Sequence, residues 1–87
     1  MSGQPSILRE IIEGPSYAVL AKKIDPTGKS LDSRLEDLLF VIARIPEEFP
    51  AVPRTKYRRA VLYGSSTLAV WFTFDDHHVT LLGIIER

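Results

Sequence analysis

The stretch RRAVLYGSSTLAVWFTFDDHHVTLLGIIER, residues 58–87, contains three apolar runs separated by two groups of turn-forming residues. Gly64-Ser65-Ser66 separates the first run from the second, and Asp75-Asp76 separates the second from the third. Glycine, serine and aspartate favour turns, whereas β-branched and aromatic residues favour strands. We therefore predict a meander of three antiparallel strands, over residues 57–63, 67–74 and 77 or 78 to 85.

The pairing of the last two predicted strands decides which of their side chains are buried. A turn formed by Asp75-Asp76 would place Phe74 opposite His77 and Phe72 opposite Val79. Side chains alternate across a strand, so one face becomes almost entirely apolar and should be buried: Leu68, Val70, Phe72, Phe74, Val79, Leu81 and Ile85. The other face is mixed: Thr67, Ala69, Trp71, Thr73, His78, Thr80, Leu82, Ile84 and Glu86. A slip of one residue in the turn would exchange the two faces of the last strand.

The strongest helical signal lies between residues 31 and 45. Apolar residues recur there every three or four positions: Leu31, Leu35, Leu38, Leu39, Ile42 and Ile45. Ser30 is the expected N-cap, and Pro46 should end the helix. We expect this amphipathic helix to cover one face of the sheet, and residues 46–56 to form a proline-rich connector without regular structure.

The N-terminal third gives weaker signals. Residues 1–4 are expected to form a flexible tail, and the apolar spacing over residues 5–13 predicts a short helix ended by Gly14-Pro15. Residues 16–24 fit either a helix or a strand, and their alanine, leucine and lysine content favours a helix. The following DPTGKS, residues 25–30, predicts a turn. No strand is expected before the helices.

Composition limits the class of protein. The chain has 87 residues, enough for a single domain over residues 1–87, and its 11 basic residues balance its 11 acidic ones. This balance argues against a nonspecific nucleic-acid binder, which would be basic. The absence of cysteine excludes disulfides and thiolate metal sites and suggests a reducing, cytoplasmic location. No apolar run approaches the ~20 residues that span a bilayer, so no membrane association is expected.

Taken together, these signals predict an α+β fold in which two or three helices pack on one face of an antiparallel sheet of three or four strands. Its second half, YRRAVLYGSS, TLAVWFTFDD and HHVTLLGIIER, resembles the RelE/ParE superfamily of bacterial type II toxins. That resemblance rests on a basic strand, a glycine-containing turn, a strand ending in acidic residues and a final apolar strand. It implies a cognate antitoxin as partner, and as target either mRNA in the ribosomal A-site or, in the ParE branch, gyrase.

The family's basic residues carry over only in part. Arg58 and Arg59 stand where the resemblance expects basic residues on the first of these strands, and Arg87 stands where it expects the final arginine. Thr67 and Leu68 replace an arginine usually found early in the middle strand, and Glu86 replaces the histidine or lysine before the last arginine. These departures weaken the expectation of ribonuclease activity. They affect the expectation of the fold less.

RNA cleavage by a 2′-hydroxyl needs a base, an acid and cations that stabilise the charge on phosphate. His78 is the candidate acid or base, with Arg58 and Arg87 as candidate cations, although an exposed histidine beside a turn is the more economical interpretation. The adjacent His77 and His78 should point to opposite faces of a strand and therefore not share a metal ion. We expect neither a metal nor a cofactor.

The remaining candidates are binding residues. Arg54, Lys56 and Arg59 belong to the main basic stretch and suit phosphate or an acidic partner, or else they simply keep an edge strand soluble. Trp71, with Thr73 on the same predicted face, would stack on an RNA base, be covered by the N-terminal helix or anchor a protein interface, and the interface is favoured.

The sequence therefore favours a toxin of a type II toxin–antitoxin pair, acting by ribosome-dependent mRNA cleavage or by non-enzymatic inhibition of a target such as gyrase. The alternative is a small non-enzymatic interaction protein, such as a phage- or plasmid-borne inhibitor or adaptor. The strand order and Arg87 favour the toxin, whereas the neutral charge and the missing arginine favour the alternative.

Overall fold

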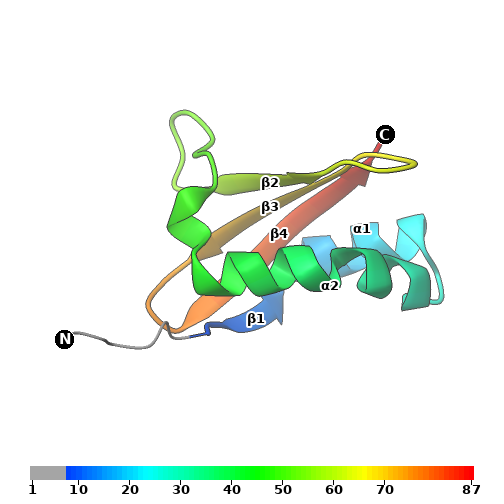
Figure 1. The fold of residues 1–87 in the computed structure, drawn as a ribbon, viewed down its shortest axis with the longest axis horizontal. Helices are drawn as coiled ribbons and strands as arrows, with labels where there is room; N and C mark the ends of the chain where they lie inside the picture. The colour runs from blue at the N-terminus through cyan, green and yellow to red at the C-terminus, as the bar shows by residue number, and fades with distance from the viewer. Residues whose placement is uncertain (1–7) are drawn as a thin grey trace.

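A computed structural model describes residues 8–87 as two helices packed with a four-stranded sheet (Figure 1). The sheet order is β1-β4-β3-β2, in which β2, β3 and β4 pair antiparallel and β1 runs parallel to β4. The predicted α+β fold is confirmed, and the sheet is mixed because of β1. In chain order the elements are β1 (Glu10–Glu13), α1 (Pro15–Ile24), α2 (Lys29–Arg44), the 3-10 turn η1 (Pro46–Glu48), β2 (Arg58–Leu62), β3 (Leu68–Phe74) and β4 (His78–Glu86).

The strand β1 replaces the last part of the helix predicted over residues 5–13. Glu10–Glu13 pairs in register with residues 78–81 of β4, and Gly14 donates its N–H to the carbonyl of Leu81 at 2.9 Å. The helical prediction was wrong for these residues. The spacing of Ile7, Leu8, Ile11 and Ile12 suits a helix, but so short a pattern does not exclude a strand. The free edge of β4 offers backbone hydrogen bonds, and these decide for the strand. Residues 1–7, including the predicted tail, lie outside the described part of the chain.

The helix favoured for residues 16–24 is confirmed as α1, which has Pro15 in its first turn. The turn before α2 differs in detail from the prediction. Gly28 adopts a left-handed conformation with φ of 78°, α2 begins at Lys29, and Ser30 is not its N-cap. Instead the Asp25 carboxylate accepts a hydrogen bond from the N–H of Leu31 at 3.0 Å, a donor that the first helical turn leaves free.

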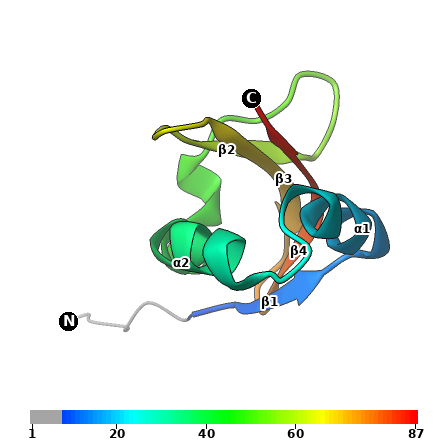
Figure 2. The same cartoon turned by 90° about the vertical axis from the view of Figure 1, so that its right-hand side faces the viewer.

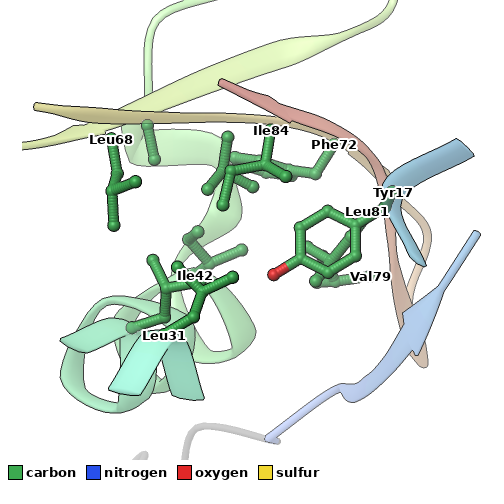
Figure 3. Packing of buried hydrophobic residues seen from close by; sticks show 11 residues of the cluster. Tyr17, Leu31, Ile42, Leu68, Phe72, Val79, Leu81 and Ile84 are labelled. Atoms are coloured by element: carbon green, nitrogen blue, oxygen red, sulfur yellow. The ribbon is translucent and has the colours of Figure 1, made fainter. Parts of the chain in front are cut away.

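The core lies between α2 and the concave side of the sheet, which curves around this helix, with α1 beside β4 (Figure 2). Figure 3 shows how apolar side chains from both helices meet those of the strands. The residues that α2 contributes to the core belong to the predicted helical stripe, because Leu31, Leu35 and Ile42 are buried. Pro46 ends α2 as predicted, and the connector after it contains only the short η1. The buried apolar cluster comprises Tyr17, Leu31, Leu35, Ile42, Ala60, Leu68, Val70, Phe72, Val79, Leu81 and Ile84.

All three predicted strands of the meander are present, but the last two pair differently from the prediction. Phe74 lies opposite Val79 and Phe72 opposite Leu81. The turn is closed by the N–H of Asp75, which donates to the carbonyl of His78 at 2.9 Å. The Asp75 carboxylate also accepts hydrogen bonds from the N–H groups of His77 and His78, so Asp76 and His77 form the tip. The observed register of β3 and β4 differs from the predicted one by two residues. Because a shift by an even number keeps each side chain on its face, Val79 and Leu81 remain on the buried face as predicted.

Beyond Leu81 the strand β4 contains a bulge. Trp71 pairs with Gly83, while its neighbour Phe72 pairs with Leu81, so Leu82 is an extra residue in β4. The bulge inverts the alternation of the side chains that follow. Ile84 is therefore buried, at 1% exposure, whereas Ile85 is 36% exposed, and the predicted placement of this pair was wrong.

Candidate functional site

The sheet has a second face that points away from the buried cluster, and we call it the outer face. It presents Arg59 from β2 and Trp71 and Thr73 from β3, because their neighbours Ala60, Val70 and Phe72 point into the core. Phe72 and Val79 are fully buried, whereas Trp71 is half-buried on the side of β3 opposite to the one that packs against α2. The mixed face expected from the sequence therefore exists between β2 and the C-terminal part of β4.

A shallow cavity of about 190 Å³ lies on the outer face, and we call it the outer-face hollow. Arg59 on β2 lies directly opposite Trp71 on the neighbouring strand β3. Arg87 is held beside β3 by two backbone hydrogen bonds with Thr67, at 2.9 and 2.8 Å. Neither guanidinium group forms an ion pair with another residue between 8 and 87. No acidic side chain lines the outer-face hollow, so its side chains suit an anionic or aromatic group. Its lining consists of Arg59, Val61, Thr67, Ala69, Trp71, Ile85 and Arg87.

His78 lies at the other end of β4 from Arg87, at its first residue. Its Nε2 is 3.7 Å from a carboxylate oxygen of Glu10, and its Nδ1 is 3.4 Å from one of Asp75. The hydrogen bonds from the N–H groups of His77 and His78 lower the pKa of Asp75, with a smaller contribution from the His78 side chain. The surroundings of His78 are thus acidic, and a nearby phosphate would be repelled by two carboxylates.

Arg58 points to the core side of the sheet. Its Nη1 donates to the carbonyl oxygens of Phe49, at 2.6 Å, and of Glu47, at 3.2 Å. Its guanidinium group also lies 5.6 Å from the centre of the Phe74 ring. Arg58 therefore fastens the connector to β2, and the structure does not bring His78, Arg58 and Arg87 together.

The predicted basic stretch is divided by the fold. Arg54 and Lys56 lie exposed in the loop before β2, where Arg54 has a left-handed φ of 66°. Arg58 points to the core side and Arg59 to the outer face. Thr73 lies on the outer face opposite Thr80, between Trp71 and the hairpin turn.

Within residues 8–87 no group of three or more histidine, cysteine, aspartate or glutamate side chains is arranged to hold a metal ion. The two adjacent histidines have ring centres 6.3 Å apart, with His77 in the turn and His78 in β4. In the same part of the chain, no helix combines the length and the apolar character needed to cross a bilayer.

The sequence analysis missed a second hollow, which lies between the two helices. It has a volume of about 410 Å³ and contains the buried Tyr17 and the acidic Glu13 and Asp32 in its lining. Tyr17 belongs with Leu20, Ala21 and Ile24 to an apolar stripe of helical spacing, and such a stripe does not show that acidic residues of β1 and α2 lie near the Tyr17 hydroxyl.

No protein-family model matches the sequence, and no curated protein matches it.

Proposed function

We propose that this protein is a growth-inhibiting toxin of a type II toxin–antitoxin pair that acts by binding its target without catalysis. Its contact surface with the target is the outer-face hollow, centred on Arg59, Trp71 and Arg87. The observation that carries the proposal is the concentration of two arginines and a tryptophan around one cavity whose lining has no acidic side chain.

The non-catalytic mode is supported by the separation of the candidate catalytic residues. Cleavage of RNA requires a proton-transfer group and a cation within hydrogen-bond reach of the same phosphate. His78 and Arg87 stand at opposite ends of β4, and Arg58 is on the other side of the sheet, bound to two carbonyl groups. A protein target such as gyrase therefore suits the surface better than mRNA.

The binding role is supported by the chemistry of the hollow. Tryptophan and arginine are the residue types that most often carry the binding energy of protein interfaces. Because Arg59 and Arg87 form no ion pair within residues 8–87, their guanidinium groups can bind a partner's carboxylate or phosphate without breaking an existing ion pair. The meander of β2, β3 and β4 supports the toxin assignment, because the resemblance rests on these three strands.

Induced expression of the whole chain in a bacterium tests this function. We expect growth arrest, relief of the arrest by the product of a neighbouring small gene, and ribosome-associated mRNA ends that do not change within the first minutes. Harmless expression at a high level of folded protein would contradict the toxin assignment. Rapid appearance of new mRNA ends would contradict the non-catalytic mode and leave the toxin assignment standing.

An interaction protein of another kind, an inhibitor or adaptor, is favoured by one observation, the balance of 11 basic and 11 acidic residues. It would use the same hollow for a protein partner, and it would not stop growth. The growth experiment therefore separates the two functions directly.

A further inference from the structure

The hollow between α1 and α2, which we call the interhelix hollow, lies away from the outer face. The residues around it come from the end of β1, from one side of α1, from the turn at residues 25–28 and from the first turn of α2. Its volume of about 410 Å³ falls in the range of small-ligand sites. Ala18, Ala21 and Leu31 supply an apolar part of its wall.

The side chain of Tyr17 lines the interhelix hollow, and its hydroxyl has no hydrogen-bond partner within residues 8–87. Tyr17 is only 3% exposed, and its hydroxyl forms no hydrogen bond with any other residue in the described range. Figure 3 shows the ring entering the space between the helices, with its oxygen directed toward α2. Within residues 8–87 no side-chain polar atom is both enclosed and unpartnered, so the Tyr17 oxygen opens into the hollow, where a ligand atom or water can bind it.

Two carboxylates next to this hydroxyl are also without a partner. The exposed side chains of Glu13 and Asp32 line the interhelix hollow and take part in no ion pair within residues 8–87. Asp25 also lines it, but three hydrogen bonds from Thr27 and Leu31 already occupy its oxygens. Lys22 is the one cationic residue of the lining. The site is therefore predominantly acidic, with an acceptor set that is open to a donor.

The protonation of Tyr17 reflects the same surroundings. Burial first, and then the nearby charges of Glu13 and Asp32, together raise the pKa of Tyr17 to about 12. The phenol thus remains neutral at physiological pH, when its oxygen can accept a hydrogen bond. The negative potential of both carboxylates also reaches this oxygen, which favours a positively charged donor.

We propose that the interhelix hollow binds an organic cation, a guanidinium or primary ammonium group on a short apolar stem. The cationic N–H groups would donate to the Tyr17 hydroxyl and to the carboxylates of Glu13 and Asp32, while the stem packs on Ala18, Ala21 and Leu31. The cation has two plausible sources, a free small amine or the side chain of an arginine on a partner protein. This inference does not depend on the proposed function, because the two hollows share no residue.

Titration of the ¹⁵N-labelled full chain with n-butylguanidinium, followed by backbone amide chemical shifts, tests the proposal. The neutral isostere n-butylurea is the matched ligand control. We expect saturable shifts at residues 13–18 and 28–32 with the cation, with a Kd on the order of millimolar for so small a ligand, and no saturable shifts with the urea. Equal binding of both compounds, or no binding of the cation, would overturn the proposal.

Two variants locate the site. Tyr17→Phe removes one oxygen, and the double variant Glu13→Gln with Asp32→Asn removes both charges with little change of shape. We expect each to weaken binding by about tenfold, the loss typical of a hydrogen bond to a charged group. Glu36→Gln, an exposed acid of α2 outside the interhelix hollow, should bind as the wild type does. Wild-type affinity in the double variant would overturn the proposal, and the amide spectrum reports whether each variant is folded.

The same titration with agmatine and with N-acetyl-arginine amide identifies the source of the cation. Tighter binding of agmatine supports a free amine, and tighter binding of the arginine derivative supports a partner's side chain. Failure of both compounds would overturn the proposal even if the growth experiment succeeds.

Discussion

Arg58 and Arg59 are neighbours in sequence with opposite surroundings. The pleat of β2 turns Arg58 toward two backbone carbonyls and the Phe74 ring, and Arg59 toward the outer-face hollow. The sequence showed two adjacent arginines on a predicted strand, and alternation places them on different faces. It could not show which one would meet the connector, because that depends on the path of residues 46–57.

This pair gives a matched prediction for stability. Arg58→Ala should lower the free energy of unfolding by about 1–2 kcal/mol, because it removes a partly buried hydrogen bond to Phe49, an exposed one to Glu47 and a contact with Phe74. Arg59→Ala, at an exposed position, should change it by less than about 0.5 kcal/mol. Urea unfolding of both variants measures the difference. Equal destabilisation would contradict the structural role of Arg58.

The Asp25 carboxylate makes the stability of the turn at residues 25–28 depend on pH. Its carboxylate accepts hydrogen bonds from the N–H groups of Leu31 and Thr27 and from the Thr27 hydroxyl. These hydrogen bonds, that from Leu31 first, lower the pKa of Asp25 from its ordinary 3.8. An acid with a lowered pKa stabilises the fold at pH values above its unfolded-state pKa, and this stabilisation is lost as the pH falls through the folded-state value.

We therefore expect Asp25→Asn to be less stable than the wild type at pH 7 and close to it at pH 2. Asp37→Asn removes the same charge from an exposed position of α2 and should show no such pH dependence. Unfolding by urea at several pH values checks both variants. A stability difference that persists unchanged at pH 2 would show that the Asp25 charge has no part in holding the turn.

At the scale of elements, the meander and α2 could be predicted because their apolar patterns are long and agree with one period. The β1 strand could not, since its four residues gain their structure from the edge of β4 rather than from their own pattern. The bulge at Leu82 was equally hidden. A single extra residue in β4 leaves no mark on composition, yet it decides that Ile84 and not Ile85 is buried.

The junction between β1 and α1 offers a test of this arrangement. A Cβ on Gly14 would lie 2.7 Å from the carbonyl oxygen of Leu81, too close to fit without movement of the backbone. Gly14→Ala should therefore cost about 1–3 kcal/mol of unfolding free energy. The matched Gly64→Ala, whose Cβ would meet its nearest neighbour at 3.6 Å, should be nearly neutral. If thermal or urea unfolding finds both variants equally stable, β1 does not pack on β4 as described.

At the scale of the whole molecule, the sheet separates the side that builds the core from the side that we propose to bind a target. Its inner face and the two helices form the buried cluster, and its outer face gathers Arg59, Trp71 and Arg87. The sequence supported the prediction that Trp71 lies on a mixed face, because alternation decides this. Assembly of the hollow could not be predicted, since it requires residues from three strands and the exact ending of β4 after the bulge.

The measurement that tests the central claim most directly is the growth of cells that express two charge-reversed variants. Arg59→Glu with Arg87→Glu reverses the charge of the outer-face hollow, whereas Lys23→Glu with Lys29→Glu makes the same change of net charge at exposed positions outside it. We predict that the arginine variant no longer arrests growth at wild-type levels of folded protein, and that the lysine variant arrests growth as the wild type does. Undiminished arrest by the arginine variant would contradict the assignment of the outer face as the working surface.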